Sequence, residues 1–180
     1  MYKHVIFDLD GTLLNTIDDL ADTGNHVCEL HGWPTYTVAE FKLMVGNGIP
    51  KLVERFAPQG TSQEVLDQAF QEFMDWYGVH KEDKTAPYAG MPEVTKALRE
   101  AGVSIAVLSN KADVMAGLGA TQEDTLFVGD SNVDIRTAKN GGLTGCGVLW
   151  GFRSREELEA AGADVIVSTP QELLDLILKA

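Results

Sequence analysis

The chain has 180 residues, of which 44% are hydrophobic, and its formal net charge is −13. This length suits one domain or a core domain with a small insert, and no stretch approaches the roughly 20 apolar residues that a membrane span needs. The acidic balance argues against a nucleic-acid partner, because no basic run is present to replace the counterions of a phosphate backbone.

The N-terminal residues 1–4 run directly into an apolar segment and lack the regions of a signal peptide. Cys28 and Cys146 lie far apart and have no metal-type spacing. We therefore expect a cytoplasmic protein with reduced thiols and no membrane partner, present as a monomer or a homodimer.

The first predicted element is a strand over residues 3–9, whose short, apolar, β-branched sequence is typical of a strand buried on both faces. It ends in the polar, turn-forming cluster Asp8-Leu9-Asp10-Gly11-Thr12. A helical pattern then begins at Asn15 and continues to about His80. We predict that residues 16–84 form an all-helical insert.

Local signals divide this insert into helices. Gly32-Trp33-Pro34 stops the first helix, and Thr37 with Glu40 forms a capping box for a short second one. A third helix is predicted over residues 49–56, after the break at Gly46-Asn47-Gly48. Thr61 with Glu64 is predicted to cap a longer fourth helix with an apolar stripe.

The remainder of the chain alternates between helices and apolar strands. Met91-Pro92 opens a helix that ends at Gly102, and further helices are predicted around residues 135–141, 154–161 and from 169 onward. Strands are predicted over residues 103–108, 125–128, 143–150 and 163–167. This alternation predicts an α/β core, a doubly wound parallel sheet built from residues 1–15 and 85–180.

Polar clusters follow three of these strands at their carboxyl ends, where sheets of this kind bind ligands. They are Asp8 with Asp10, Ser109-Asn110-Lys111, and Asp130 with Asp134. Each cluster taken alone is explained more simply as a turn or a helix cap. Three clusters at equivalent strand ends predict one shared site.

These residue types can perform phosphoryl transfer. Carboxylate oxygens from one of Asp8 and Asp10 and from Asp130 suit Mg²⁺, which also accepts substrate phosphate oxygens. One carboxylate can attack phosphorus while Asp10 gives and later takes a proton. Ser109, Asn110 and the backbone N–H groups of Gly11-Thr12 can hold the phosphoryl oxygens.

The same residues resemble a known family. Residues 8–13, Ser109-Asn110 and the run from Gly129 to Asp134 resemble motifs I, II and IV of the haloacid dehalogenase (HAD) superfamily. The helical insert resembles the C1 cap of that superfamily, beside its Rossmannoid core. The tail over residues 147–164 is similar to phosphoglycolate phosphatases.

The resemblance implies a role for each matching residue. Asp8 is the nucleophile and Asp10 the general acid and base, and an aspartate at position 10 favours a phosphatase over a dehalogenase. Mg²⁺ would be bound by Asp8, the Asp10 carbonyl and Asp130, and Asp134 would support the metal site through water or by contacting the residues that bind the ion. Thr12, Ser109 and Asn110 bind phosphate.

The expected substrate is a small phosphorylated metabolite, with 2-phosphoglycolate as the first choice. Pyrophosphate hydrolysis and a sugar-phosphate mutase reaction are alternatives that keep the same scaffold. In the insert, Asn47 and Lys51 occupy the region that meets the substrate in this superfamily. Lys51 is explained equally well as a solvated lysine on a helix.

One departure from the superfamily concerns motif III, a lysine near a Lys-Pro pair. This chain contains no Lys-Pro pair, and it passes from Lys111 through Ala116 and Gly117 directly to the strand at residue 125. Either a segment between Ala116 and Gly117 is missing from this sequence, or the protein truly lacks it. In the second case Lys111 is the only nearby cation, and a non-catalytic binding protein becomes a third hypothesis.

Overall fold

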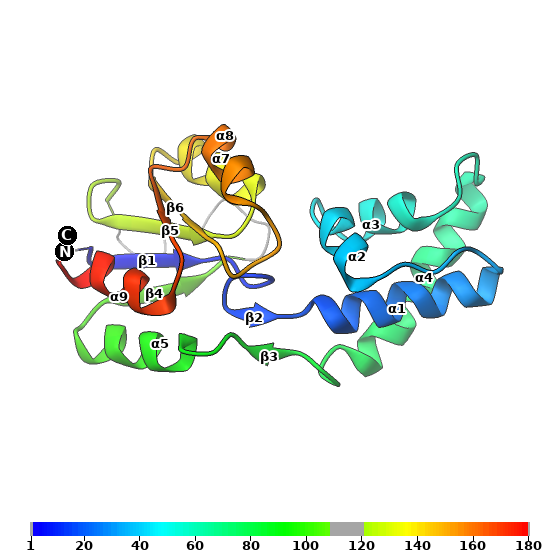
Figure 1. Ribbon diagram of the computed structural model, residues 1–180, viewed down its shortest axis with the longest axis horizontal. Coiled ribbons are helices and arrows are strands. Elements are labelled where there is room, and N and C mark those ends of the chain that lie inside the picture. The colour runs from blue at the N-terminus through cyan, green and yellow to red at the C-terminus, as the bar shows by residue number, and fades with distance from the viewer. Residues whose placement is uncertain (1, 109–120, 180) are drawn as a thin grey trace. The chain divides into compact units, whose positions relative to one another are not determined.

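The computed structural model describes residues 2–108 and 121–179. The chain divides into two compact units, one made of residues 1–15 and 87–180 and the other of residues 16–86. Figure 1 shows the first as a sheet flanked by helices and the second as a group of helices. Ser109, Asn110 and Lys111, three of the predicted site residues, lie outside the described residues.

The first unit contains a five-stranded sheet in the order β4-β1-β5-β6-β7, and every described pairing of neighbouring strands is parallel. These strands are β1 (His4–Phe7), β4 (Ser104–Val107), β5 (Thr125–Gly129), β6 (Thr144–Val148) and β7 (Val165–Val167). The predicted parallel α/β fold class is confirmed. Several strands are shorter than predicted, because apolar residues at their ends belong to the connecting loops.

Helices cover both faces of this sheet, with α5 and α9 on one side and α7 and α8 on the other (Figure 1). They are α5 (Met91–Glu100), α7 (Asn132–Asn140), α8 (Arg155–Ala161) and α9 (Pro170–Lys179). Alternating side chains of β1 divide between the two faces: Val5 and Phe7 pack in the cluster that contains α5 and α9, and Ile6 packs with Ala138 of α7. This alternation is the period of two that strand geometry imposes.

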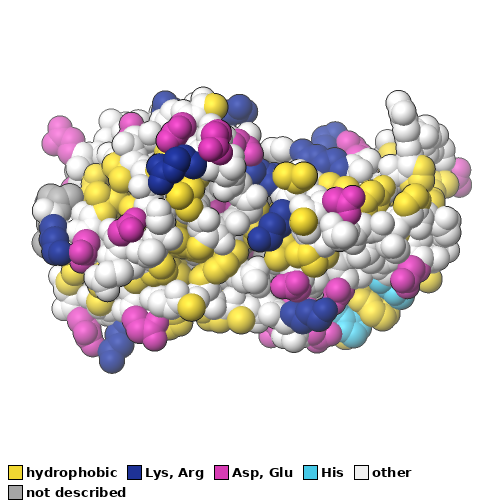
Figure 2. Space-filling model, viewed as in Figure 1, with side chains coloured by type: hydrophobic (Ala, Val, Ile, Leu, Met, Phe, Trp, Pro, Cys, Tyr) yellow, Lys and Arg dark blue, Asp and Glu magenta, His cyan; other side chains and the backbone are white. Residues whose placement is uncertain are grey.

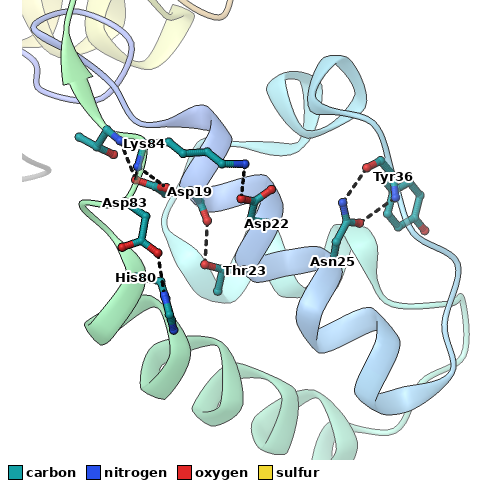
Figure 3. Close-up of polar contacts among 9 residues, drawn as sticks. Asp19, Asp22, Thr23, Asn25, Tyr36, His80, Asp83 and Lys84 are labelled. Atoms are coloured by element: carbon teal, nitrogen blue, oxygen red, sulfur yellow. Dashed lines mark hydrogen bonds and ion pairs between the residues drawn. The ribbon is translucent and has the colours of Figure 1, made fainter.

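The second unit consists of α1 (Ile17–His31), α2 (Val38–Met44), α3 (Ile49–Phe56) and α4 (Gln63–His80). Its core is aromatic, with Phe41, Phe56 and Phe73 fully buried and their ring centroids spaced by 6.1 and 6.3 Å. The side-chain amide of Asn25 exchanges two 2.8 Å hydrogen bonds with the backbone of Tyr36 (Figure 3), which fastens the segment after α1 to that helix.

The predicted cap at Thr37 is confirmed, since its side chain accepts a hydrogen bond from the backbone N–H three residues later, and Ser154 caps α8 in the same way. The cap predicted at Thr61 is wrong. Ser62 is the capping residue of α4 and accepts from the N–H of Val65, whereas the Thr61 hydroxyl donates to the carbonyl of Pro58 at 2.7 Å. A cap must directly precede the first helical residue, and the turn after Pro58 ends one residue later than the sequence suggests.

Among the residues that the structure describes, a second sheet pairs β2 (Leu14–Asn15) with β3 (Ala86–Pro87). These short strands belong to the two chain segments that lead into and out of the helical unit. Among the described helices, none has both the length and the apolar character needed to cross a membrane.

Two helical glycines give a matched test of packing in the helical unit. A Cβ on Gly24 of α1 would lie 2.4 Å from the ring of Phe41, whereas a Cβ on Gly78 of α4 would meet nothing within 4 Å. We expect Gly24→Ala to lower the free energy of unfolding by about 1–3 kcal/mol through overpacking. Gly78→Ala should raise it by about 0.5 kcal/mol. Urea unfolding of both variants checks this, and equal effects would contradict the packing described.

Candidate active site

The loop after β1 is a tight turn anchored on the neighbouring strand. The Asp8 N–H donates to the carbonyl of Val128 at 2.9 Å, and the carbonyl of Leu9 accepts from the N–H groups of Leu13 and Leu14 at 3.0 Å each. Gly11 has a φ of +87°, and a Cβ at this position would lie 2.5 Å from a carboxylate oxygen of Asp130. Glycine is therefore required both for the turn and for the close approach to Asp130.

Three carboxylates meet at the carboxyl ends of β1 and β5. Asp8, Asp130 and Asp134 each offer an oxygen that lies within 4.8 Å of the other two. Asp130 is 2% exposed and Asp134 is 8% exposed. The clustering follows from topology, because β1 and β5 are parallel neighbours whose paired residues Phe7 and Val128 directly precede Asp8 and Gly129.

The cluster is electrostatically strained when it is fully ionised. Burial, followed by the charges of Asp134 and Asp130, raises the pKa of Asp8 to about 8. Burial raises the pKa of Asp130 to about 7, although a hydrogen bond from Phe152 and the charge of Arg153 lower it. Burial also raises the pKa of Asp134. A bound cation would remove this strain, since it favours the ionised form of each group.

Asp134 has a structural role as well. Its carboxylate accepts from the N–H of Ser131 at 2.9 Å and from the Ser131 hydroxyl at 2.7 Å, and Ser131 in turn caps α7. The helix-cap interpretation of this loop is therefore correct, and it coexists with the carboxylate cluster. Gly129 permits the arrangement, because a Cβ there would lie 2.2 Å from the Cβ of Asp134.

The segment after β6 completes the surroundings of the site, and the sequence did not predict this. The Phe152 N–H donates to Asp130 at 2.6 Å, and the indole N–H of Trp150 donates to the carbonyl of Thr12 at 3.0 Å. A Cβ on Gly151 would lie 2.2 Å from the Cβ of Asp130. In the sequence, only the position of these residues after the carboxyl end of a predicted strand could have indicated that they lie near the site.

The other predicted site residues are placed as follows. Thr12 is completely buried, and its hydroxyl has no hydrogen-bond partner among the described residues. Asp10 is partly buried and is not part of the carboxylate cluster found among the described side chains. Asn47 and Lys51 are exposed in the helical unit, where Lys51 forms an ion pair with Glu54 and Asn47 has a φ of +64°. That ion pair agrees with the solvated-lysine interpretation.

The residues present fit a magnesium ion. Hard oxygen ligands from a few carboxylates are the donor set that Mg²⁺ prefers, and all three members of this cluster have a raised pKa without it. The Thr12 hydroxyl, which has no hydrogen-bond partner in the described part of the chain, adds a polar atom that a phosphate oxygen could satisfy.

The raised pKa values of the carboxylate cluster predict how the stability of the metal-free protein depends on pH. Because the folded-state pKa values of Asp8 and Asp130 lie above 3.8, the folded protein binds more protons than the unfolded chain from about pH 4 to about pH 8. The free energy of unfolding should therefore fall as the pH rises through this window, by a few kcal/mol. Thermal melting in EDTA at pH 5.5 and pH 8 measures the fall.

The variant Asp130→Asn serves as the control for this prediction. It removes one charge but keeps an oxygen for the Phe152 N–H, so its melting temperature in EDTA should exceed that of the wild type at pH 8. The same variant should gain less stability from added Mg²⁺. A wild-type protein that melts higher in EDTA at pH 8 than at pH 5.5 would contradict the account.

The chain combines a parallel α/β unit, a carboxylate cluster at the ends of its strands, and a helical insert. These features define a class of hydrolases, and comparison with known proteins identifies that class. The family model described as haloacid dehalogenase-like hydrolase matches residues 5–116, and a second, described as HAD-hydrolase-like, matches residues 106–173. The chain belongs to the haloacid dehalogenase-like hydrolase family.

Proteins similar to this chain indicate which kind of hydrolase it is. A phosphoglycolate phosphatase of Vibrio vulnificus is 28% identical over 219 residues, which cover 98% of this chain and 96% of the relative. An N-acetylmuramic acid 6-phosphate phosphatase of Pseudomonas aeruginosa is 27% identical, over 99% of this chain and 96% of the relative. A crystal structure from Lactobacillus delbrueckii subsp. bulgaricus, assigned to the phosphoglycolate phosphatases, has a TM-score of 0.93 and 28% identity and covers 99% of both chains. The predicted enzyme class, a phosphatase, is confirmed.

The comparison also bears on the predicted gap. The alignment with the Vibrio vulnificus relative is longer than the chain itself, so that relative carries residues with no counterpart here. The first family model stops at residue 116, where the sequence predicts the gap.

Proposed function

We propose that the protein is a Mg²⁺-dependent phosphomonoester hydrolase that works through an aspartyl-phosphate on Asp8. The observation that carries this proposal is the cluster of Asp8, Asp130 and Asp134 at the ends of β1 and β5. A group of three carboxylates, of which Asp130 and Asp134 are buried and Asp8 is partly buried, is unfavourable in isolation and suits a site that binds a cation together with a phosphate.

The reaction would proceed in two steps. A carboxylate oxygen of Asp8 attacks phosphorus, the bond between phosphorus and the ester oxygen breaks, and Asp10 donates a proton to the leaving alkoxide. Water then attacks the acyl-phosphate, Asp10 takes a proton from that water, and inorganic phosphate leaves with Asp8 restored. The Thr12 hydroxyl and the backbone of the Gly11 turn would hold phosphoryl oxygens during both steps.

Mg²⁺ held by Asp8 and Asp130, with support from Asp134, would neutralise charge on the phosphoryl group. The surface agrees with a small substrate. On the face shown in Figure 2, Lys and Arg side chains are interspersed with Asp and Glu side chains rather than gathered into a stripe that could follow a nucleic-acid backbone. A cytoplasmic location and a monomeric or homodimeric state belong to the same proposal.

We propose 2-phosphoglycolate as the substrate, on the strength of the phosphoglycolate phosphatases among the relatives. Release of inorganic phosphate should be compared for 2-phosphoglycolate, a sugar 6-phosphate and pyrophosphate, each with Mg²⁺. The proposal expects the highest kcat/KM for 2-phosphoglycolate. A preference for the sugar phosphate or pyrophosphate would reject the substrate but keep the phosphatase, whereas interconversion of sugar-phosphate isomers without phosphate release would indicate a mutase.

The missing motif III supports a second candidate, a non-catalytic binding protein of the same fold. It is favoured by the residues that a relative carries and this chain lacks. The intact mass of the purified protein separates the two cases. A mass well above that of these 180 residues would mean that a segment is missing from the sequence, and an equal mass together with no Mg²⁺-dependent turnover would favour the binding protein.

A further inference from the structure

The helical unit contains a buried carboxylate that the proposed reaction does not use. Asp19 lies in the first turn of α1 and is only 2% exposed. Its carboxylate accepts hydrogen bonds from two consecutive backbone N–H groups of the returning chain, from Lys84 at 2.9 and 3.1 Å and from Thr85 at 2.8 Å. Figure 3 shows this carboxylate facing the Lys84 backbone, while the Lys84 side chain turns away to Asp22.

These bonds fix the returning segment firmly. A buried carboxylate that loses its hydrogen-bond donors is strongly disfavoured, so release of Lys84 and Thr85 would leave the negative charge of Asp19 without partners. The position of Asp19 at the start of α1 stabilises that charge further, because the helix dipole is positive there. The carbonyl of Asp19 also accepts from the buried hydroxyl of Thr23 at 2.7 Å, which holds this turn of the helix in place.

The fixed segment leads directly into the second sheet. Lys84 and Thr85 precede β3, β3 pairs with β2, and β2 is followed at once by Thr16 and α1. At the other end of this ribbon, the Tyr88 N–H donates to the carbonyl of Leu13 at 3.1 Å. The chain segments that enter and leave the helical unit are the two linkers. They are thus joined at both ends of the β2-β3 ribbon, by Asp19 at one end and by Leu13 at the other.

We propose that Asp19 is a positioning residue, which ties the returning linker to α1 so that β2 and β3 move as one paired hinge. The inference rests on the proposed function for its catalytic consequence. Leu13 directly follows Thr12, the candidate phosphate ligand, so a paired hinge couples movement of the helical unit to the turn that holds the phosphoryl group. With unpaired linkers, the helical unit could move while the turn stayed still.

Hydrogen exchange at the hinge tests the proposal without relying on activity. The amide exchange rates of Lys84, Thr85, Ala86 and Tyr88 should be compared for the wild type, Asp19→Ala and Asp22→Ala. Asp22 is a matched control, since it lies on the same helix, carries the same charge and contacts Lys84 through an exposed side-chain ion pair at 2.6 Å. Asp19→Asn is a milder variant that keeps one acceptor oxygen and guards against loss of folding in Asp19→Ala.

We expect Asp19→Ala to speed exchange at least tenfold at all four amides, Asp19→Asn to have a smaller effect, and Asp22→Ala to have none. With 2-phosphoglycolate, kcat/KM should fall at least tenfold for Asp19→Ala at a temperature where the variant is folded, and should stay unchanged for Asp22→Ala. Unchanged exchange at Lys84 and Thr85 in Asp19→Ala would show that Asp19 does not hold the returning segment, and would overturn the proposal. Faster exchange confined to those two residues, or loss of stability with unchanged kcat/KM, would overturn the paired hinge.

Absence of turnover in the wild type would reject the proposed function instead. The spread of faster exchange from Thr85 to Tyr88 would then still decide whether Asp19 couples the two linkers.

Discussion

Replacing Asp8 by asparagine is expected to reduce phosphate release at least about 10⁴-fold, the largest effect of any single substitution in this chain. An amide is a very weak nucleophile and cannot form the acyl-phosphate. The substitution also removes one negative charge from the cluster with Asp130 and Asp134, so folding should not suffer. Phosphate release from 2-phosphoglycolate with saturating Mg²⁺ measures the change.

The matched control is Asp175→Asn, which changes the same residue type on α9, where the half-exposed carboxylate pairs with Lys179 and accepts a hydrogen bond from Gln171 at 3.0 Å. It should leave turnover unchanged. In EDTA at pH 8, Asp8→Asn should melt at a higher temperature than the wild type, because burial and its neighbours oppose the charge on Asp8. Turnover within tenfold of the wild type in folded Asp8→Asn would rule out Asp8 as the nucleophile.

Removal of divalent metal is expected to have an effect as large as that of Asp8→Asn and to lower phosphate release to the background rate. Without a cation, Asp8 and Asp130 have a raised pKa, so the nucleophile is partly protonated near neutral pH. A phosphate dianion would also meet the remaining negative charge of the cluster. Dialysis against EDTA followed by titration with Mg²⁺ tests this, and activity should return with the added metal.

Asp130→Asn sharpens the metal experiment, since it keeps the shape of the side chain and removes one anionic ligand. The Mg²⁺ concentration for half-maximal activity should rise at least tenfold, while the metal-free variant should be more stable than the wild type at pH 8. These opposite directions separate a metal ligand from a residue that only supports the fold. Full activity in EDTA, or an unchanged Mg²⁺ requirement in the variant, would contradict the metal site.

The fold was largely predictable because its signals are local and strong. Short apolar runs such as Val5-Ile6-Phe7 must be buried on both faces, and only a parallel sheet covered by helices provides this. The capping box at Thr37 was predictable for the same reason. The cap of α4 was not, because Thr61 and Ser62 are equally good caps in sequence and the turn after Pro58 decides between them.

The candidate site was predictable only in part. Asp8 and Asp130 follow buried strands, and parallel pairing brings such positions together, as the structure shows. The contributions of Trp150 and Phe152 come from an indole and a backbone N–H, which leave no chemical signature in the sequence. The role of Asp19 could not be predicted from the sequence either, because its hydrogen-bond partners lie 65 and 66 residues away.

The most direct measurement of the central claim is detection of the phosphorylated residue itself. The wild-type protein is mixed with 2-phosphoglycolate and Mg²⁺, quenched in acid during turnover, reduced with borohydride and analysed by peptide mass spectrometry. Borohydride converts an aspartyl-phosphate to homoserine, so the account predicts homoserine at residue 8, and none when EDTA replaces Mg²⁺. Rapid phosphate release with an unmodified Asp8, or with the modification at another residue, would contradict it.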